Sequence, residues 1–245
     1  MRQIKAIGII PARYDSSRFP GKVLAEMKTK PMIWHVWERA RQAASLEKVI
    51  IACDDERILK ASLDFGAEAL MTSKHHNSGT DRITEIINPL DVDVVVNIQA
   101  DEPLIHPSMI NGLVEAFKDN PDICVSTLVK KITDEEDLFN PNIVKVVVDK
   151  NNFALYFSRA AIPHLAANSE VKIVDYYKHI GLYAYTKDFL FTFKKLTVSK
   201  LETIEKLEQL RIIENGYKIK VVETKFDTVS VDRLEDLKRA EEHLK

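Results

Sequence analysis

The chain lacks the two commonest nucleotide-binding signatures. It has only 7 glycines in 245 residues, and none of them falls in a GxxxxGKS, GxxxxGKT or GxGxxG pattern. A P-loop protein and a dinucleotide-binding protein are therefore disfavoured. A nucleotide site in this chain would have to hold phosphate by other means.

Cysteine is equally scarce. Cys53 and Cys124 are the only two, and each lies in an apolar, strand-like run. Two isolated cysteines form neither a disulfide framework nor a CxxC metal site. We therefore expect two buried thiols, which behave as small apolar side chains.

Long apolar runs and a charge excess are also missing. No stretch approaches the roughly 20 apolar residues that span a bilayer, and the run after the N-terminal MRQIK is too short for a signal peptide. We therefore expect a cytoplasmic protein without a membrane partner. The net charge is −2, whereas nonspecific nucleic-acid binding needs a broad basic surface. No nucleic-acid partner is expected either.

What the chain does contain is a regular alternation of apolar runs and amphipathic segments. Strands are predicted at 6–10, 48–53, 67–71 and 92–99, with helices at 31–44, 55–65 and 81–87 between them. Several of the strands are apolar on both faces, as in a parallel sheet covered on both sides. The predicted fold is α/β, with a mostly parallel, Rossmann-like sheet and helices on both faces.

The second half has a different texture. Strands are predicted at 123–130, 143–148, 179–186 and 217–224, an irregular excursion at 161–174, and helices at 201–215 and 233–244. No flexible linker or repeat separates the halves, so we expect a single domain over 1–245. Its second half would be a smaller elaboration of the same sheet, and the irregular middle is a candidate dimer surface.

Residues 11–22, PARYDSSRFPGK, follow the first predicted strand. Ligands gather at the carboxyl ends of the strands in an open α/β sheet, and this loop lies at one of them. It carries three cations, two hydroxyl groups and a Pro-Gly turn, which together suit a triphosphate. A solvated surface turn is the competing interpretation. The cations and hydroxyls are Arg13, Arg18, Lys22, Ser16 and Ser17.

Two carboxylates stand at comparable places. Asp101 follows the strand at 92–99, where it faces the neighbouring loop and could hold Mg²⁺ against phosphate. It could equally be a turn or helix-capping acid. Asp232 precedes the last predicted helix as an N-cap or as the second carboxylate of a metal site.

Six motifs, in this order along nearly the whole chain, resemble those of the 3-deoxy-D-manno-octulosonate (Kdo) cytidylyltransferases, or CMP-Kdo synthetases. They are IPARYxSSRFPGK at 10–22, SGTDR at 78–82, NxQxDEP at 97–103, HIGLYxY at 179–185, LEQLR at 207–211, and VD at 231–232 followed by EDL at 235–237. The chain departs from the family where Ala100 and Ser230 replace the usual glycines, and where arginine-leucine at 233–234 replaces threonine-proline.

The resemblance implies a fold of the nucleotide-diphospho-sugar transferase type, CTP and Kdo as substrates, Mg²⁺ as cofactor and a homodimer. It implies a nucleotide-binding half at about 1–120, and sugar-binding and dimerisation elements at about 121–230. The product would be CMP-Kdo, for lipopolysaccharide biosynthesis in a Gram-negative bacterium.

The resemblance also implies roles for individual residues. The triphosphate would contact Arg13, Ser16, Ser17, Arg18 and Lys22, and the cytosine and ribose Ser78, Gly79 and Thr80. The metal ligands would be Asp101 and Asp232, which with Arg13 and Lys22 form the catalytic set. The sugar acid would contact Arg82, Gln99, His179, Tyr183, Glu208 and Gln209.

Ordinary structural roles compete with several of these functions. A lone histidine in an apolar run, such as His179, is more often a hydrogen-bonded core residue. Glu208 and Gln209 would ordinarily form the solvated face of a helix. The adjacent pair His75 and His76 lacks metal-ligand spacing and is assigned no metal. Two rival functions stay open: a cytidylyltransferase for another substrate, and a noncatalytic nucleotide-binding module.

Overall fold

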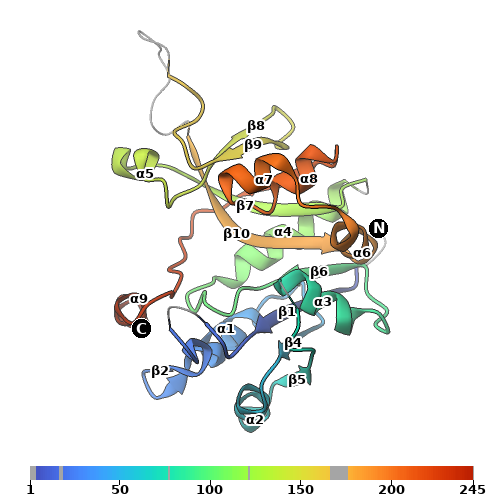
Figure 1. Ribbon diagram of the computed structural model, residues 1–245, viewed down its shortest axis with the longest axis vertical. Coiled ribbons are helices and arrows are strands. Elements are labelled where there is room, and N and C mark those ends of the chain that lie inside the picture. Colours follow the sequence, from blue (N-terminus) through green and yellow to red (C-terminus); the bar gives the residue numbers. More distant parts are fainter. Residues whose placement is uncertain (1–3, 17–18, 77, 121, 166–175, 245) are drawn as a thin grey trace.

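The computed structural model describes residues 4–16, 19–76, 78–120, 122–165 and 176–244. Nine of their strands form one sheet, with the order β11-β7-β10-β6-β1-β4-β5 and with β8 and β9 branching from β10 (Figure 1). These strands are β1 (Ala6–Ala12), β4 (Lys48–Cys53), β5 (Glu68–Met71), β6 (Val94–Asn97), β7 (Val125–Lys131), β8 (Lys145–Val148), β9 (Ala154–Ser158), β10 (Tyr177–Thr186) and β11 (Ile219–Glu223). A separate two-stranded hairpin contains β2 (Glu26–Met27) and β3 (Lys30–Pro31).

The part of the sheet built by the first half is parallel throughout. Strand β1 pairs in parallel with β4 and β6, and β4 with β5. The second half joins this sheet through β10, which runs antiparallel to both β6 and β7. The loops that follow β1, β4 and β6 therefore leave at the same edge of the sheet.

Helices cover both faces of the sheet (Figure 1). They are η1 (Lys22–Leu24), α1 (Met32–Ala40), α2 (Glu56–Asp64), α3 (Gly79–Ile87), α4 (Pro107–Asp119), α5 (Glu135–Phe139), α6 (Lys187–Lys195), α7 (Lys200–Glu205), α8 (Leu210–Glu214) and α9 (Leu234–Glu242). Alternate side chains of β1 enter two separate cores, as strand geometry requires. Ile10 belongs to the core that includes residues of α1, α4 and α9, and Ile9 belongs to the core that includes residues of α3, α6 and α8. The predicted α/β fold class is confirmed.

The predicted long helix at 201–215 is wrong. Two short helices, α7 and α8, take its place, and Lys206 between them has φ 57. This left-handed conformation costs a non-glycine residue about 1–2 kcal/mol. The break turns Leu207 and Gln209 inward, where both are buried. Hydrogen bonds from Ser158 and Arg159 to Glu205, the last residue of α7, favour the break over a continuous helix.

Smaller differences have simple causes. Helix α3 begins at Gly79 because the Ser78 side chain caps it, two residues before the predicted start. No prediction covered α4, α6 or β9. The excursion expected at 161–174 falls largely on residues 166–175, outside the described residues.

The two cysteines are both free thiols, but only one is fully buried. Cys53 is buried, and burial together with the Asp54 carboxylate raises its pKa to about 11. Cys124 is only partly buried, because it lies just before β7 begins, so that part of the expectation is wrong.

Within the described ranges, none of the helices combines the length and the apolar character needed to cross a membrane.

Candidate functional site

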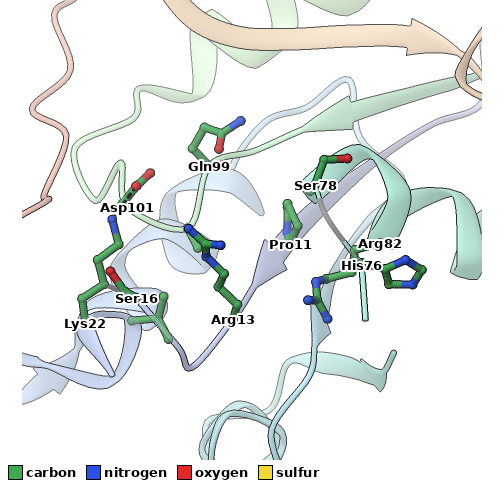
Figure 2. A pocket seen from close by; sticks show the side chains of 12 residues that line it. Pro11, Arg13, Ser16, Lys22, His76, Ser78, Arg82, Gln99 and Asp101 are labelled. Carbon is green, nitrogen blue, oxygen red and sulfur yellow. Dashed lines mark hydrogen bonds and ion pairs between the residues drawn. The ribbon is translucent and has the colours of Figure 1, made fainter. Parts of the chain in front are cut away.

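A cavity of about 320 Å³ lies at the edge of the sheet where β1 and β6 end. Figure 2 shows Lys22 reaching Asp101 on one side of it, with His76 and Arg82 on the other side and Gln99 above. The sequence-predicted residues that line the cavity are Arg13, Ser16, Lys22, Ser78, Gly79, Arg82, Gln99 and Asp101. The structure thus gathers side chains from the first three motifs around one space.

The loop after β1 is bent back on itself at Gly21. Gly21 has φ 69, and its N–H donates to the Tyr14 carbonyl at 2.9 Å. A Cβ at this position would lie 3.1 Å from the Tyr14 ring, so glycine is needed for both the conformation and the space. The turn aims Lys22 at the cavity. Ser17 and Arg18 lie outside the described residues.

Lys22 joins the two predicted metal carboxylates. Its Nζ donates to Asp101 Oδ2 at 2.7 Å and to Asp232 Oδ1 at 3.0 Å, and also to the Val231 carbonyl at 3.0 Å. Burial lowers the pKa of Lys22, but the two carboxylates outweigh this effect and hold the pKa above its usual value. The lysine is therefore a fixed cation at neutral pH.

Asp232 reaches this place along an extended segment, residues 224–233, which links β11 to α9 (Figure 1). The Val231 N–H donates to the Asp101 carbonyl at 2.9 Å. Upstream, Thr228 hydrogen-bonds to Glu102, whose pKa is raised to about 7 by burial and by the adjacent Asp101 carboxylate. Asp227 forms ion pairs with Lys130 and Lys178. Contacts at Asp227, Thr228 and Val231 thus fix the segment directly before Asp232.

The donor set suits a hard divalent cation. Two carboxylates, Asp101 and Asp232, already share one cation, the Lys22 ammonium. No cluster of three or more histidine, cysteine or acidic residues suited to a metal occurs among the residues described. Mg²⁺ commonly uses only one or two carboxylates and completes its octahedron with water and substrate phosphate. The two aspartates therefore fit Mg²⁺ better than a metal that needs a complete protein cage.

Helix α3 points its N-terminus at the cavity. The Ser78 side chain accepts from the Asp81 N–H at 3.1 Å. Gly79 packs so closely on Pro11 that a Cβ would lie 3.1 Å from the proline Cγ. Ser78 and Gly79 line the cavity, whereas Thr80 is buried in the first helical turn and does not. The role of Thr80 stays a prediction.

Arg82, which is predicted to contact the sugar acid, pairs with Asp54 in the structure. Its guanidinium is buried and donates to Asp54 Oδ2 at 2.9 Å, and it also contacts Thr72 and the Ser73 carbonyl. Asp54 in turn accepts from the Tyr14 N–H at 3.0 Å. Arg82 thus braces the first loop through Asp54, and its contact with a sugar carboxylate stays a prediction.

Two of the predicted sugar-binding residues lie on β10. Tyr183 pairs in register with Asn97 at the end of β6, and its ring centroid is 5.4 Å from that of His179. His179 Nε2 lies 2.9 Å from Thr127 Oγ1, which also donates to the Leu182 carbonyl. Both bonds are satisfied when Nε2 carries the proton, so that Nδ1 is an acceptor.

These groups are uncharged at neutral pH. Burial lowers the pKa of His179 to about 3. Burial and the Glu208 carboxylate raise the pKa of Tyr183, although a hydrogen bond with Thr127 opposes this increase. This side of the site therefore offers neutral hydrogen-bonding groups, which is what sugar hydroxyls need.

Glu208 and Gln209 lie between α7 and α8, beside the same strand. Glu208 influences the titration of Tyr183 and Tyr185, so its carboxylate lies near both rings. Its own pKa is raised, chiefly by burial, although Arg211 opposes this. Asp81, in the first turn of α3, adds to the increase. Among the described residues that line the cavity, none is His179, Tyr183, Glu208 or Gln209, so their contact with a substrate stays a prediction.

Sequence reasoning missed Asp54 and His76. Asp54 directly follows β4, at the same sheet edge as the first loop, and that position was the available signal. His76 lines the cavity and contacts Glu85. No local pattern marks His76 as a cavity residue, because the pair that it forms with His75 lacks metal-ligand spacing.

The departure at Ala100 is harmless to the backbone. Among the described residues, the non-glycine positions with positive φ are Lys28, Thr29, Asn152 and Lys206, so Ala100 is not one of them. Its methyl group lines the cavity without backbone strain.

The titration of His179 makes a testable prediction about stability. Below pH 6.5 the unfolded chain takes up a proton at this histidine, whereas the folded protein stays neutral there until about pH 3. The free energy of unfolding should therefore fall as the pH is lowered from about 6.5 towards 3, by at most about 1.4 kcal/mol per pH unit from this residue. Urea unfolding at several pH values would measure it.

His179→Gln should flatten this dependence, and the exposed His243→Gln should leave it unchanged. An unaltered pH dependence in His179→Gln would show that the ring is not held neutral.

Comparisons with known proteins bear on the whole chain. A family described as Cytidylyltransferase matches residues 7–219. The 3-deoxy-manno-octulosonate cytidylyltransferase of Fusobacterium nucleatum is 46% identical over 243 residues, which are 99% of this chain and 98% of that protein. The enzyme of the same name from Syntrophotalea carbinolica is 49% identical over 243 residues, 97% of each chain.

Solved structures agree with the sequence comparison. A CMP:2-keto-3-deoxy-manno-octonic acid synthetase in complex with CTP is 41% identical, covers 97% of each chain and superposes with a TM-score of 0.91. The 4-diphosphocytidyl-2C-methyl-D-erythritol synthase of Anaerococcus prevotii is 12% identical, covers 98% of each chain with a TM-score of 0.65, and shows a shared fold only. Near-complete coverage at more than 40% identity means that the chain belongs to the 3-deoxy-manno-octulosonate cytidylyltransferase family.

Proposed function

We propose that this chain transfers CMP from CTP to Kdo and releases pyrophosphate, with Mg²⁺ as cofactor. The observation that carries the proposal is the convergence of Asp101 and Asp232 on one cation beside a cavity that also contains Arg13. A module that only binds a nucleotide has no need of both carboxylates. Family membership supports the same substrates.

The first loop would hold the triphosphate. Arg13 and Lys22 would neutralise the charge that grows on the departing pyrophosphate, which is the main task of protein groups in phosphoryl and nucleotidyl transfer. Ser16 would donate to phosphate oxygen, together with Ser17 and Arg18. Ser78, Gly79 and Thr80 would line the cytosine and ribose side.

Asp101 and Asp232 would hold Mg²⁺, which when bound polarises the α-phosphate and lowers the pKa of the attacking sugar hydroxyl. The 2-hydroxyl of Kdo would attack the α-phosphorus in line, without a covalent enzyme intermediate. Gln99, His179, Tyr183, Glu208 and Gln209 would orient the sugar, and Arg82 would complete this set. In this arrangement the protein positions the reactants and stabilises charge.

The halves of the chain would divide this work. Residues of about 1–120 would bind the nucleotide, and about 121–230 would bind the sugar and form the dimer. We place the activity in the cytoplasm, where CTP is available, as a step of lipopolysaccharide biosynthesis.

A homodimer is part of the proposal. Exposed apolar side chains gather in the second half, where Phe139, Leu155 and Leu165 are 66%, 56% and 46% exposed. Phe139 and Leu165 border an apolar groove, and such surfaces mark association sites. We expect light scattering at micromolar concentration to give the mass of two chains. The mass of one 28.0 kDa chain would contradict the dimer.

The function is tested by pyrophosphate release from CTP with Kdo, its 8-amino analogue or sialic acid. We expect Kdo to support release only when Mg²⁺ is present, so that chelation abolishes it. If only another sugar acid supported turnover, that acid would replace Kdo as the assigned substrate. Silence with all three, from a protein that still binds CTP, would favour a binding module.

Asp101→Asn tests the metal assignment. The amide keeps the shape but removes the charge that would hold Mg²⁺, so we expect kcat to fall by about 100-fold or more. CTP binding should weaken but stay measurable by calorimetry. The exposed Asp64→Asn serves as the control and should keep its activity. Near-wild-type turnover in Asp101→Asn would rule out this carboxylate as a metal ligand.

A further inference from the structure

Residues 206–209, which we name the sugar turn, connect α7 to α8 without helical structure. Lys206 has φ 57, so the chain changes direction directly after Glu205, the last residue of α7. The turn carries Glu208 and Gln209. A four-residue irregular segment would not hold two side chains in one orientation unless its ends were fixed.

The first end of the turn is fixed by the Glu205 carboxylate. Glu205 Oε1 accepts from the Ser158 hydroxyl at 2.6 Å, and Oε2 accepts from the Arg159 N–H at 3.0 Å. Ser158 is 3% exposed and ends β9. Each carboxylate oxygen thus accepts from its own donor, one in the last residue of β9 and one in the residue that follows it, 47 and 46 residues away in sequence.

Arg159 returns the contact. Its Nε donates to the backbone carbonyl of Glu205 at 2.9 Å, a helix C-terminal carbonyl that lacks a helical partner. Its Nη1 donates to the Pro141 carbonyl at 3.0 Å. One arginine therefore links the end of α7 to the loop before β8. Glu205 and Arg159 thus form a reciprocal clamp of two hydrogen bonds, in which the side chain of each residue bonds to the main chain of the other.

The second end of the turn is fixed separately. Arg211, in α8, donates through Nε to Glu202 Oε2 at 2.7 Å and forms an ion pair with the same carboxylate. This pair holds α7 and α8 against each other but does not connect them to the sheet. Glu205 ties the turn to the last residue of β9 through Ser158 and to the residue that follows the strand through Arg159.

We propose that Glu205 and Arg159 are positioning residues that set the affinity for the sugar acid without touching it. Their clamp fixes the position of the sugar turn relative to β10. It therefore also fixes how far the side chains of Glu208 and Gln209 extend toward the substrate. The inference rests on the proposed function, in which those two side chains bind Kdo. A displacement of about 1 Å in a positioning group can lower the catalytic rate by on the order of 100-fold.

The test uses Glu205→Gln and Ser158→Ala in the full-length protein. Glutamine keeps the size of the side chain but replaces one carboxylate oxygen with an amide NH₂. This group cannot accept the hydrogen bond that Ser158 or Arg159 now donates. We expect the KM for Kdo to rise about 10-fold or more in Glu205→Gln and less in Ser158→Ala. The KM for CTP and the calorimetric Kd of CTP should stay within about twofold of the wild-type values.

Arg41→Met is the matched control. Arg41 and Glu38 form a two-bond arginine–glutamate pair on the exposed side of α1, far in sequence from the sugar turn. Its loss should change neither KM. If Glu205→Gln instead raises both KM values together, or lowers the thermal midpoint while leaving the KM for Kdo unchanged, the residue is merely structural and the proposal fails.

A double-mutant cycle separates this inference from the proposed function. Glu208→Ala with Gln209→Ala should raise the KM for Kdo, and adding Glu205→Gln to that variant should raise it little further. No effect of the Glu208 and Gln209 changes would overturn the sugar assignment itself. A full effect there, with Glu205→Gln acting additively, would overturn the positioning role alone.

Discussion

The Lys22 ammonium lies between two carboxylates that come from distant parts of the chain. Asp101 is 79 residues away in sequence and Asp232 is 210 residues away, yet both contact the same nitrogen. Two carboxylates this close repel one another unless a cation lies between them. A positive charge at this point therefore stabilises the approach of Asp232 to Asp101.

The same constraint explains how the cavity is organised. The side proposed for the triphosphate contains the cations Arg13 and Lys22 and the aspartates that would hold Mg²⁺. The residues proposed for the sugar include His179 and Tyr183, which burial keeps neutral. In the proposed arrangement a charged nucleotide and a hydroxyl-rich sugar would each find groups of suitable charge. Gln99 lies at the boundary and lines the cavity beside Asp101.

Positioning is carried by residues that do not face the cavity. Asp54 fastens the first loop to Arg82, Asp227 fastens the C-terminal segment to Lys130 and Lys178, and Glu205 fastens the sugar turn to β9. Each is a carboxylate that accepts from two donors. The donors to Asp54 and to Asp227 come from separate elements, and those to Glu205 are adjacent residues at the end of β9. Such contacts hold side chains within the tolerance that an in-line transfer requires.

The sequence by itself determined the parallel sheet and the location of the first loop, because apolar runs and a Pro-Gly turn leave a local pattern. Arg13 and Asp101 could be assigned to one edge because each follows a strand of the predicted parallel sheet, whereas Ser78 was assigned to the site only through the resemblance of its motif. Only the tertiary structure decided that Asp232 meets Asp101, that Arg82 pairs with Asp54, and that the helix predicted at 201–215 is broken at Lys206. The first two outcomes depend on contacts between residues 28 to 210 positions apart. The third involves a left-handed residue next to Glu205, whose carboxylate bonds to residues 46 and 47 positions away, and no local pattern records such contacts.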